Sequence, residues 1–87
     1  MSIDVHHEPQ NRRFVTVIDG HEAYLAYLPA GEGKVDFLST YSPPELRGRG
    51  VAAALVAEGL SWARAEGLEV IPSCSYVQRY LERENAS

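Results

Sequence analysis

The chain has 87 residues, 45% of them hydrophobic and 23% charged, which predicts one domain over residues 1–87 with a modest core. Its net charge of -4 argues against a nucleic-acid surface, and no apolar run approaches the roughly 20 residues of a membrane span. The single cysteine excludes an internal disulfide and fits a reducing cytoplasm, so we expect a cytoplasmic protein, a monomer or weak dimer, without nucleic-acid or membrane partners.

The N-terminal part of the chain predicts a polar segment followed by a hairpin. Residues 1–11 are polar and are expected to form an exposed strand or tail. His6 and His7 have no third ligand at a spacing typical of metal sites, so no metal site is predicted. Strand-forming residues run from Arg12 to Ile18 and, after the turn signal Asp19-Gly20, from Glu22 to Leu28. These two segments predict an antiparallel pair.

A third strand is predicted before a proline pair. Apolar and polar residues alternate with period two, and one face is expected to carry Val35, Phe37, Ser39 and Tyr41. Apolar residues on both faces, Leu38 included, suggest a central place in the sheet. Pro43-Pro44 ends the strand because proline cannot donate to a ladder.

Two helices and one more strand complete the predicted fold. The first helix runs from Val51 to Ala65, with Gly59 allowing close packing on the sheet and Gly67 ending the helix. The strand Leu68–Ile71 is expected to pair in parallel with the third strand, because a helix separates them. A second helix follows from Ser73 to about Arg83. The predicted class is α/β (α+β), in the order β-β-β-α-β-α, a mixed sheet with an antiparallel meander and one parallel crossover.

The junction between the third strand and the first helix has the composition of an anion-binding loop. Gly48 and Gly50 let the backbone approach a ligand closely, because no Cβ stands in the way. The first helical amides lack intrahelical acceptors and lie at the positive end of the helix dipole, where phosphate binds readily. Arg47 and Arg49 add positive charge. The loop therefore predicts a phosphate-bearing ligand, although a glycine-rich helix start with solvated arginines fits the same residues.

Three known phosphate loops can be compared with this junction. A P-loop would need Lys-Ser or Lys-Thr after the last glycine, where this chain has Val51-Ala52. A dinucleotide fingerprint would need a third glycine at Ala53. The pattern Arg/Gln-x-x-Gly-x-Gly/Ala is met by Arg47, Gly50 and Ala52. It resembles the acetyl-CoA pyrophosphate loop of the GCN5-related N-acetyltransferases.

A second motif strengthens this resemblance. The stretch is Gly67-Leu68-x-Val70-Ile71-Pro72-x-Cys74-x-Tyr76-Val77-x-x-Tyr80-Leu81. With the loop, it resembles the minimal single-domain branch of the family over about Val35 to Leu81. Members commonly carry a His-Thr pair before the loop, where this chain has Ser39-Thr40, so no role of that histidine transfers here.

The resemblance implies a ligand and a reaction. The ligand is acetyl-CoA or CoA, with its pyrophosphate on the loop residues Arg47, Gly48, Arg49, Gly50, Val51 and Ala52. Thr40 lies in the strand segment Leu38–Tyr41, where the family holds the pantetheine arm and polarises the thioester carbonyl. The implied activity is transfer of an acetyl group to an unidentified amine.

The candidate catalytic residues are Cys74, Tyr76 and Tyr80. A thiol where a helix begins has a lowered pKa, so Cys74 could accept the acetyl group, protonate the CoA sulfur or simply line the pocket. The two tyrosines are candidate acids or packing residues. Two other classes stay open: a non-catalytic CoA or acyl-CoA-binding module and, against the acidic charge, an RNA-associated Arg-Gly protein.

Overall fold

A computed structural model describes residues 3–86, with side chains described up to residue 84. Five strands form one sheet in the order β1-β2-β3-β4-β5. The elements are β1 (His6–Glu8), β2 (Arg13–Ile18), β3 (His21–Pro29), β4 (Lys34–Tyr41), α1 (Val51–Ala65), β5 (Glu69–Pro72) and α2 (Ser75–Ala86), with 3-10 turns at Pro9–Asn11 and Pro44–Leu46.

The topology confirms the predicted fold class. β1 to β4 pair antiparallel and β4 pairs with β5 in parallel, so the sheet is a meander with one crossover through α1. The structure adds β1, a three-residue strand within the polar N-terminal segment. The turn between β2 and β3 has positive φ at Asp19 and Gly20, 53° and 78°, as a tight hairpin turn requires.

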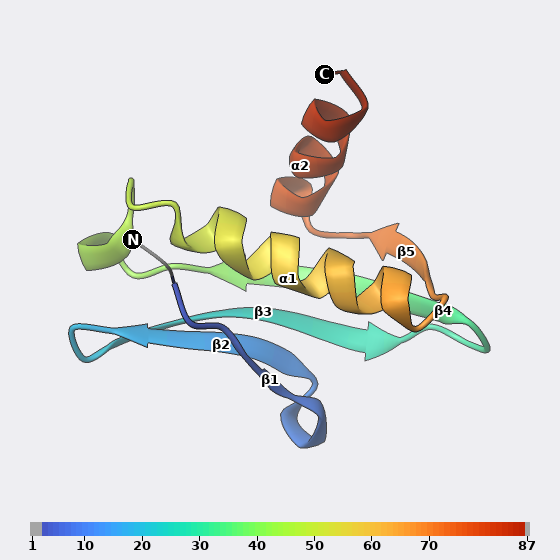
Figure 1. The fold of residues 1–87 in the computed structure, drawn as a ribbon, viewed down its shortest axis with the longest axis horizontal. Coiled ribbons are helices and arrows are strands. Elements are labelled where there is room, and N and C mark those ends of the chain that lie inside the picture. The colour runs from blue at the N-terminus through green and yellow to red at the C-terminus, as the bar shows by residue number, and fades with distance from the viewer. Residues whose placement is uncertain (1–2, 87) are drawn as a thin grey trace.

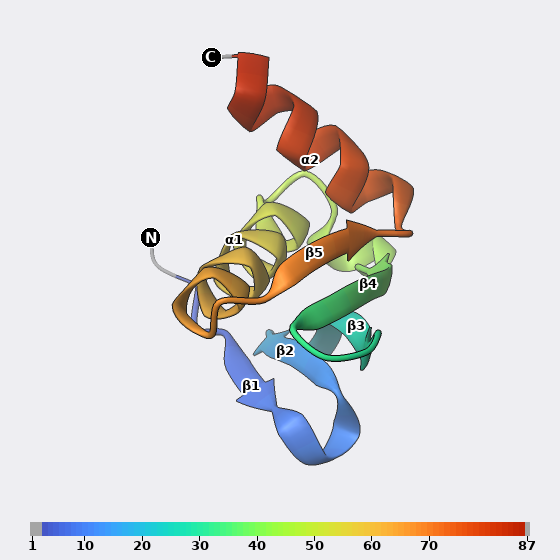
Figure 2. The ribbon, with the colours of Figure 1, turned by 90° about the vertical axis from the view of Figure 1, so that its right-hand side faces the viewer.

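Both helices lie on the same side of the sheet. α1 runs along one face of the strands (Figure 1), and α2 stands away from the sheet at the β5 edge (Figure 2). Val77 of α2 belongs to the same buried cluster as Leu55 and Val56 of α1. No helix within residues 3–86 covers the opposite face, where Val17 and Tyr41 are 61% and 44% exposed.

The first helix begins and ends at glycines. Gly50 is its N-cap residue, with φ 76°, and Gly67 follows its end with φ 68°. The amide of Gly67 donates to Arg64 and that of Leu68 donates to Ala63, the hydrogen bonds of a Schellman ending. No helix in the described part of the chain is long and apolar enough to cross a membrane.

Gly59 lets α1 pack closely on the sheet, as predicted. A Cβ at this position would lie 2.7 Å from Leu25 Cδ2 and 3.2 Å from Phe37 Cε1. Both side chains are fully buried, so neither can easily move aside. The absence of a side chain at Gly59 therefore sets the distance between α1 and the two central strands.

The predicted alternation along β4 is wrong after Phe37. The pairing runs Tyr27 with Phe37 and then Ala26 with Ser39, so Leu38 is an extra residue and forms a β-bulge. Beyond the bulge, Thr40 shares the helix-covered face with Phe37, while Ser39 and Tyr41 are exposed. A regular period of two would have placed Ser39 and Tyr41 on the core face instead. The bulge therefore turns Thr40 toward the helices.

We expect Gly59→Ala to lower the free energy of unfolding by about 1 kcal/mol. Overpacking against Leu25 and Phe37 costs about 1–3 kcal/mol, and the helix propensity of alanine returns about 1 kcal/mol. Urea unfolding measures the change, with Ser61→Ala on the exposed side of α1 as the matched control. A Gly59→Ala protein more stable than the wild type would contradict the close packing.

Candidate functional site

The parallel pair β4–β5 ends while β4 continues. Its last paired residues are Phe37 and Pro72, and the amide of Cys74 then donates to the Phe37 carbonyl at 2.9 Å. β4 extends for four more residues, 38–41, without β5 beside it. This segment therefore presents a strand edge on the β5 side, at the carboxyl ends of the two strands, where open α/β sheets bind ligands.

Cys74 lies at this edge, as the N-cap of α2. Its carbonyl accepts the first intrahelical hydrogen bond, from the Gln78 amide at 3.0 Å. Its Sγ lies 3.4 Å from Oγ1 of Thr40. The β-bulge is what brings the Thr40 side chain to this face. The structure thus brings together Cys74 and Thr40, which the sequence placed 34 residues apart.

The surroundings lower the pKa of Cys74 below the ordinary thiol value of 9.0. Partial burial, the largest single influence, raises the pKa because it disfavours the thiolate. Hydrogen bonds from the Thr40 hydroxyl and from the backbone amides of Val77, Tyr76 and Thr40 together outweigh burial. The thiolate of Cys74 therefore forms at a lower pH than that of a solvated cysteine. Two of the hydrogen-bond donors that stabilise it, the amides of Tyr76 and Val77, belong to the start of α2.

The glycine loop next to this edge is anchored where it begins. Leu46 is fully buried in the core, and the amides of Leu46 and Arg47 bond the carbonyls of Pro43 and Pro44. Gly48 then adopts φ 80°, a conformation that residues with a Cβ rarely take. The first turn of α1 follows directly, and its leading amides have no acceptor within the helix.

A cavity of about 300 Å³ lies between the loop and α2. The loop and helix-start residues Arg47, Gly48, Gly50, Val51 and Ala52 all line it, as does Tyr76. A Cβ at Gly48 or Gly50 would meet nothing within 4 Å, so the hollow reaches the glycine backbone. Five of the six predicted loop residues therefore surround one space.

Ser42 is a site residue that the sequence analysis missed. It lines the cavity, and its buried Oγ has no hydrogen-bond partner within the described residues. The sequence could have indicated Ser42 by its position, because it follows the end of β4 directly, precedes the proline pair and thus lies next to the glycine loop. An orphaned buried hydroxyl beside the free amides of α1 fits a polar ligand group.

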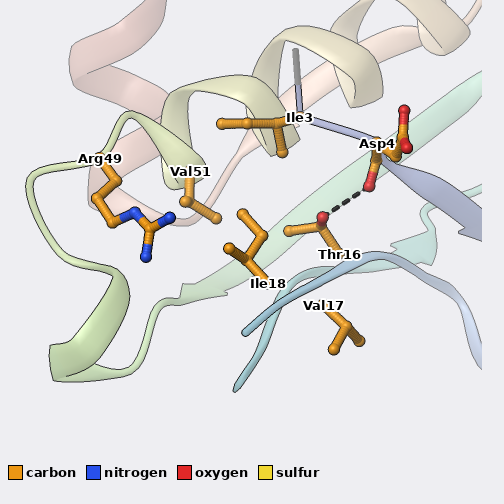
Figure 3. A pocket seen from close by; sticks show the side chains of 7 residues that line it. All are labelled: Ile3, Asp4, Thr16, Val17, Ile18, Arg49 and Val51. Atoms are coloured by element: carbon orange, nitrogen blue, oxygen red, sulfur yellow. Dashed lines mark hydrogen bonds between the residues drawn. The ribbon is translucent and has the colours of Figure 1, made fainter. Parts of the chain in front are cut away.

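The two loop arginines point to different places. Arg47 Nε donates to the Ser42 carbonyl at 3.4 Å and stays beside the cavity. Arg49 instead pairs with Asp19 at 3.1 Å and lines a separate hollow with Ile18 and Val51 (Figure 3). Only the backbone of Arg49 remains in the loop. Its guanidinium therefore does not add charge to the loop cavity, contrary to what its position in the sequence suggested.

The tyrosines of α2 also differ. Tyr76, two residues after Cys74, lines the cavity, whereas Tyr80 packs against the core one turn later and does not line it.

His7 of the histidine pair His6-His7 takes part in aromatic packing. Its ring stacks on Phe14 with ring centroids 4.2 Å apart. Residues 3–86 contain no group of three or more side chains suited to hold a metal ion.

The fold and this site together define a class of protein. The family model for the GCN5-related N-acetyltransferases matches residues 13–87, which include the loop, both helices and Cys74. The chain therefore belongs to this family, as the sequence motifs indicated.

Its relatives include proteins named NATD1 from several vertebrates. Protein NATD1 of Xenopus tropicalis is 34% identical over 83 residues, which cover 93% of this chain and 76% of that protein. Protein NATD1 of Homo sapiens is 34% identical over 82 residues, covering 92% and 73%, and that of Danio rerio is 29% identical over 80 residues, covering 90% and 73%.

We expect Thr40→Val to raise the pKa of Cys74, because it removes the hydroxyl that stabilises the thiolate. The chain has one cysteine, so the rate of iodoacetamide alkylation against pH reports on Cys74 alone. The wild-type midpoint should lie below 9.0 and should move upward in the variant. Thr40→Ser should restore it, and Ser39→Ala, on the exposed face, is the matched control. An unchanged midpoint in Thr40→Val would contradict this contact.

Proposed function

We propose that this protein transfers the acetyl group of acetyl-CoA to an amine. One observation carries the proposal: a glycine loop at a helix start follows a strand edge that has lost its partner, and a thiol of lowered pKa lies at that edge. Acetyl-CoA supplies the acetyl thioester. The acceptor must be a neutral amine, which releases a proton on acylation.

The loop residues are proposed to hold the pyrophosphate. The amides of Val51 and Ala52 lack intrahelical acceptors and carry the positive end of the α1 dipole. The backbone at Gly48 and Gly50 is open to the cavity. Arg47 adds charge from the rim, whereas Arg49 contributes its backbone alone because Asp19 engages its side chain.

The exposed edge of β4 is proposed to hold the pantetheine arm. Residues 39–41 remain paired with β3 on one side, so their position is fixed while their β5 side is open. Strand edges bind extended amide-containing chains through backbone hydrogen bonds. A backbone amide in this segment would polarise the thioester carbonyl, and Thr40 would place its side chain next to the reacting sulfur.

Cys74, Tyr76 and Tyr80 are proposed as the catalytic group. A thiol of lowered pKa can either attack a thioester as thiolate or protonate a departing thiolate, and both roles use the position of Cys74 at the open edge. Tyr76 lines the cavity and is the nearer candidate for proton transfer. Tyr80 packs one turn behind it and would support its orientation.

A second function is favoured by the uncovered face of the sheet. No helix of the described chain covers this face to form a binding site for an amine acceptor, and Val17, Leu28 and Tyr41 are exposed. A domain that binds acyl-CoA without transferring the acyl group does not need an acceptor site. In either case we propose that residues 1–87 act as one domain, as monomer or weak dimer, in a cytoplasm that keeps Cys74 reduced.

We expect Gly50→Val to weaken CoA binding at least tenfold, about 1.4 kcal/mol, because the side chain enters the cavity beside the helix amides. Calorimetric titration with CoA measures the affinity. Gly33→Val is the matched control, because Gly33 has a similar φ of 72° and also has open space around it, but lies in the β3–β4 turn. Arg47→Ala should weaken binding less, and Arg49→Ala least. Unchanged affinity in a folded Gly50→Val protein would overturn the loop assignment.

We expect saturating CoA to slow the alkylation of Cys74, because the pantetheine arm would cover the open edge. An unchanged rate would place the ligand elsewhere. Release of CoA from acetyl-CoA, measured with an amine panel and without amine, then separates enzyme from binding module. Loss of transfer in Cys74→Ala, with CoA affinity retained, would assign Cys74 a chemical role. Full turnover in that variant would reduce it to a lining residue.

A further inference from the structure

A second cavity lies at the opposite end of β4 from the proposed acetyl-CoA site. It has a volume of about 320 Å³ and is bounded by β3, β4, the end of α1 and the turn before β2. Val35 lines it and lies five residues before Thr40, a separation of about 17 Å along a strand. The two sites therefore do not share a wall.

The floor of this cavity is apolar and aromatic. Tyr27 and Val35 are buried, and Trp62 and Leu68 are partly buried beside them. The Tyr27 and Trp62 rings lie 5.1 Å apart between centroids, and the Tyr27 hydroxyl shares a 2.6 Å hydrogen bond with Nε2 of His7. Packing and this hydrogen bond hold both rings in place, so the floor is preformed.

The charged residues that line the cavity are both positive. Arg12 and Lys34 stand at the rim, and none of the described residues in the lining is acidic. Lys34 has a distant contact with Glu69, 3.8 Å, outside the lining. No hydrogen bond or ion pair engages the Arg12 side chain within the described chain, whereas its neighbour Arg13 is bound by Glu8 and Glu22. In a chain of net charge -4, two cations at one rim form a local attraction for anions.

The backbone conformation of Arg12 is unusual and holds this residue over the cavity. Arg12 has a φ of 51°, in the left-handed region that glycine or asparagine occupies at lower cost. Its carbonyl accepts a hydrogen bond from the Tyr27 amide at 2.9 Å, which fixes the residue over the cavity. The Arg12 charge also acts on the Tyr27 phenol, where it opposes the rise in pKa that burial causes.

We propose that this cavity binds a small aromatic carboxylate, with the ring on the Tyr27–Trp62 floor and the carboxylate at Arg12. A planar apolar body matches two preformed rings, and an anionic head matches a guanidinium that has no other partner among the described side chains. Lys34 contributes less, because Glu69 competes for its charge. The site is independent of the acetyl-CoA loop and of catalysis.

Phenylacetate is the probe, and phenylacetamide is its neutral isostere. Because Trp62 is the only tryptophan, a single indole N–H signal in a ¹⁵N-resolved spectrum reports on the cavity floor. Phenylacetate should shift this signal and the amides of Gly31 and Lys34 saturably, while the amides of residues 48–52 stay in place. Phenylacetamide should bind at least about fivefold more weakly.

Variants test the rim. Arg12→Gly should weaken phenylacetate binding about fivefold and keep the fold, because glycine accepts the same backbone conformation; Arg12→Asn serves if that protein does not fold. Arg79→Gln on exposed α2 is the control for the overall change of charge and should bind like the wild type. The proposal is overturned by the absence of saturable shifts, by equal affinity for the two probes, by shifts centred on residues 48–52, or by unchanged affinity in the Arg12 variants.

Discussion

The site depends on the early end of parallel pairing between β4 and β5. Pro72, the last residue of β5, has no amide to donate, and the chain turns away so that the amide of Cys74 makes the final bond to Phe37. Four residues of β4 are left with one open edge. Since β3 pairs with the other edge, the open segment is held in place on one side and accessible on the other.

The β-bulge at Leu38 gives this edge its chemistry. Without it, Thr40 would face the uncovered side of the sheet, and the Cys74 thiol would lose the hydroxyl that favours its thiolate. One inserted residue therefore couples strand geometry to thiol pKa. The start of α2 supplies the remaining donors, so two separate elements stabilise one sulfur.

The sequence predicted what depends on local backbone chemistry. The bounds of α1 follow from the glycines around it, and the Ala- and Leu-rich run Val51–Ala65 of the sequence coincides with the helix. The bulge, the orphaned hydroxyl of Ser42 and the pairing of Arg49 with Asp19 were missed. Each depends on contacts between residues far apart in the sequence, and a regular period-two pattern does not mark where a β-bulge shifts the pairing.

The loop is already ordered by contacts that involve no ligand. Leu46 is buried, Arg47 reaches back to the Ser42 carbonyl, and Arg49 is tied to the β2–β3 turn through Asp19. Folding therefore orders the loop backbone without a ligand, and a ligand that binds there need not supply that ordering free energy. By this reasoning the ion pair of Arg49 with Asp19 serves the site indirectly, because it holds the segment between the two glycines that line the cavity.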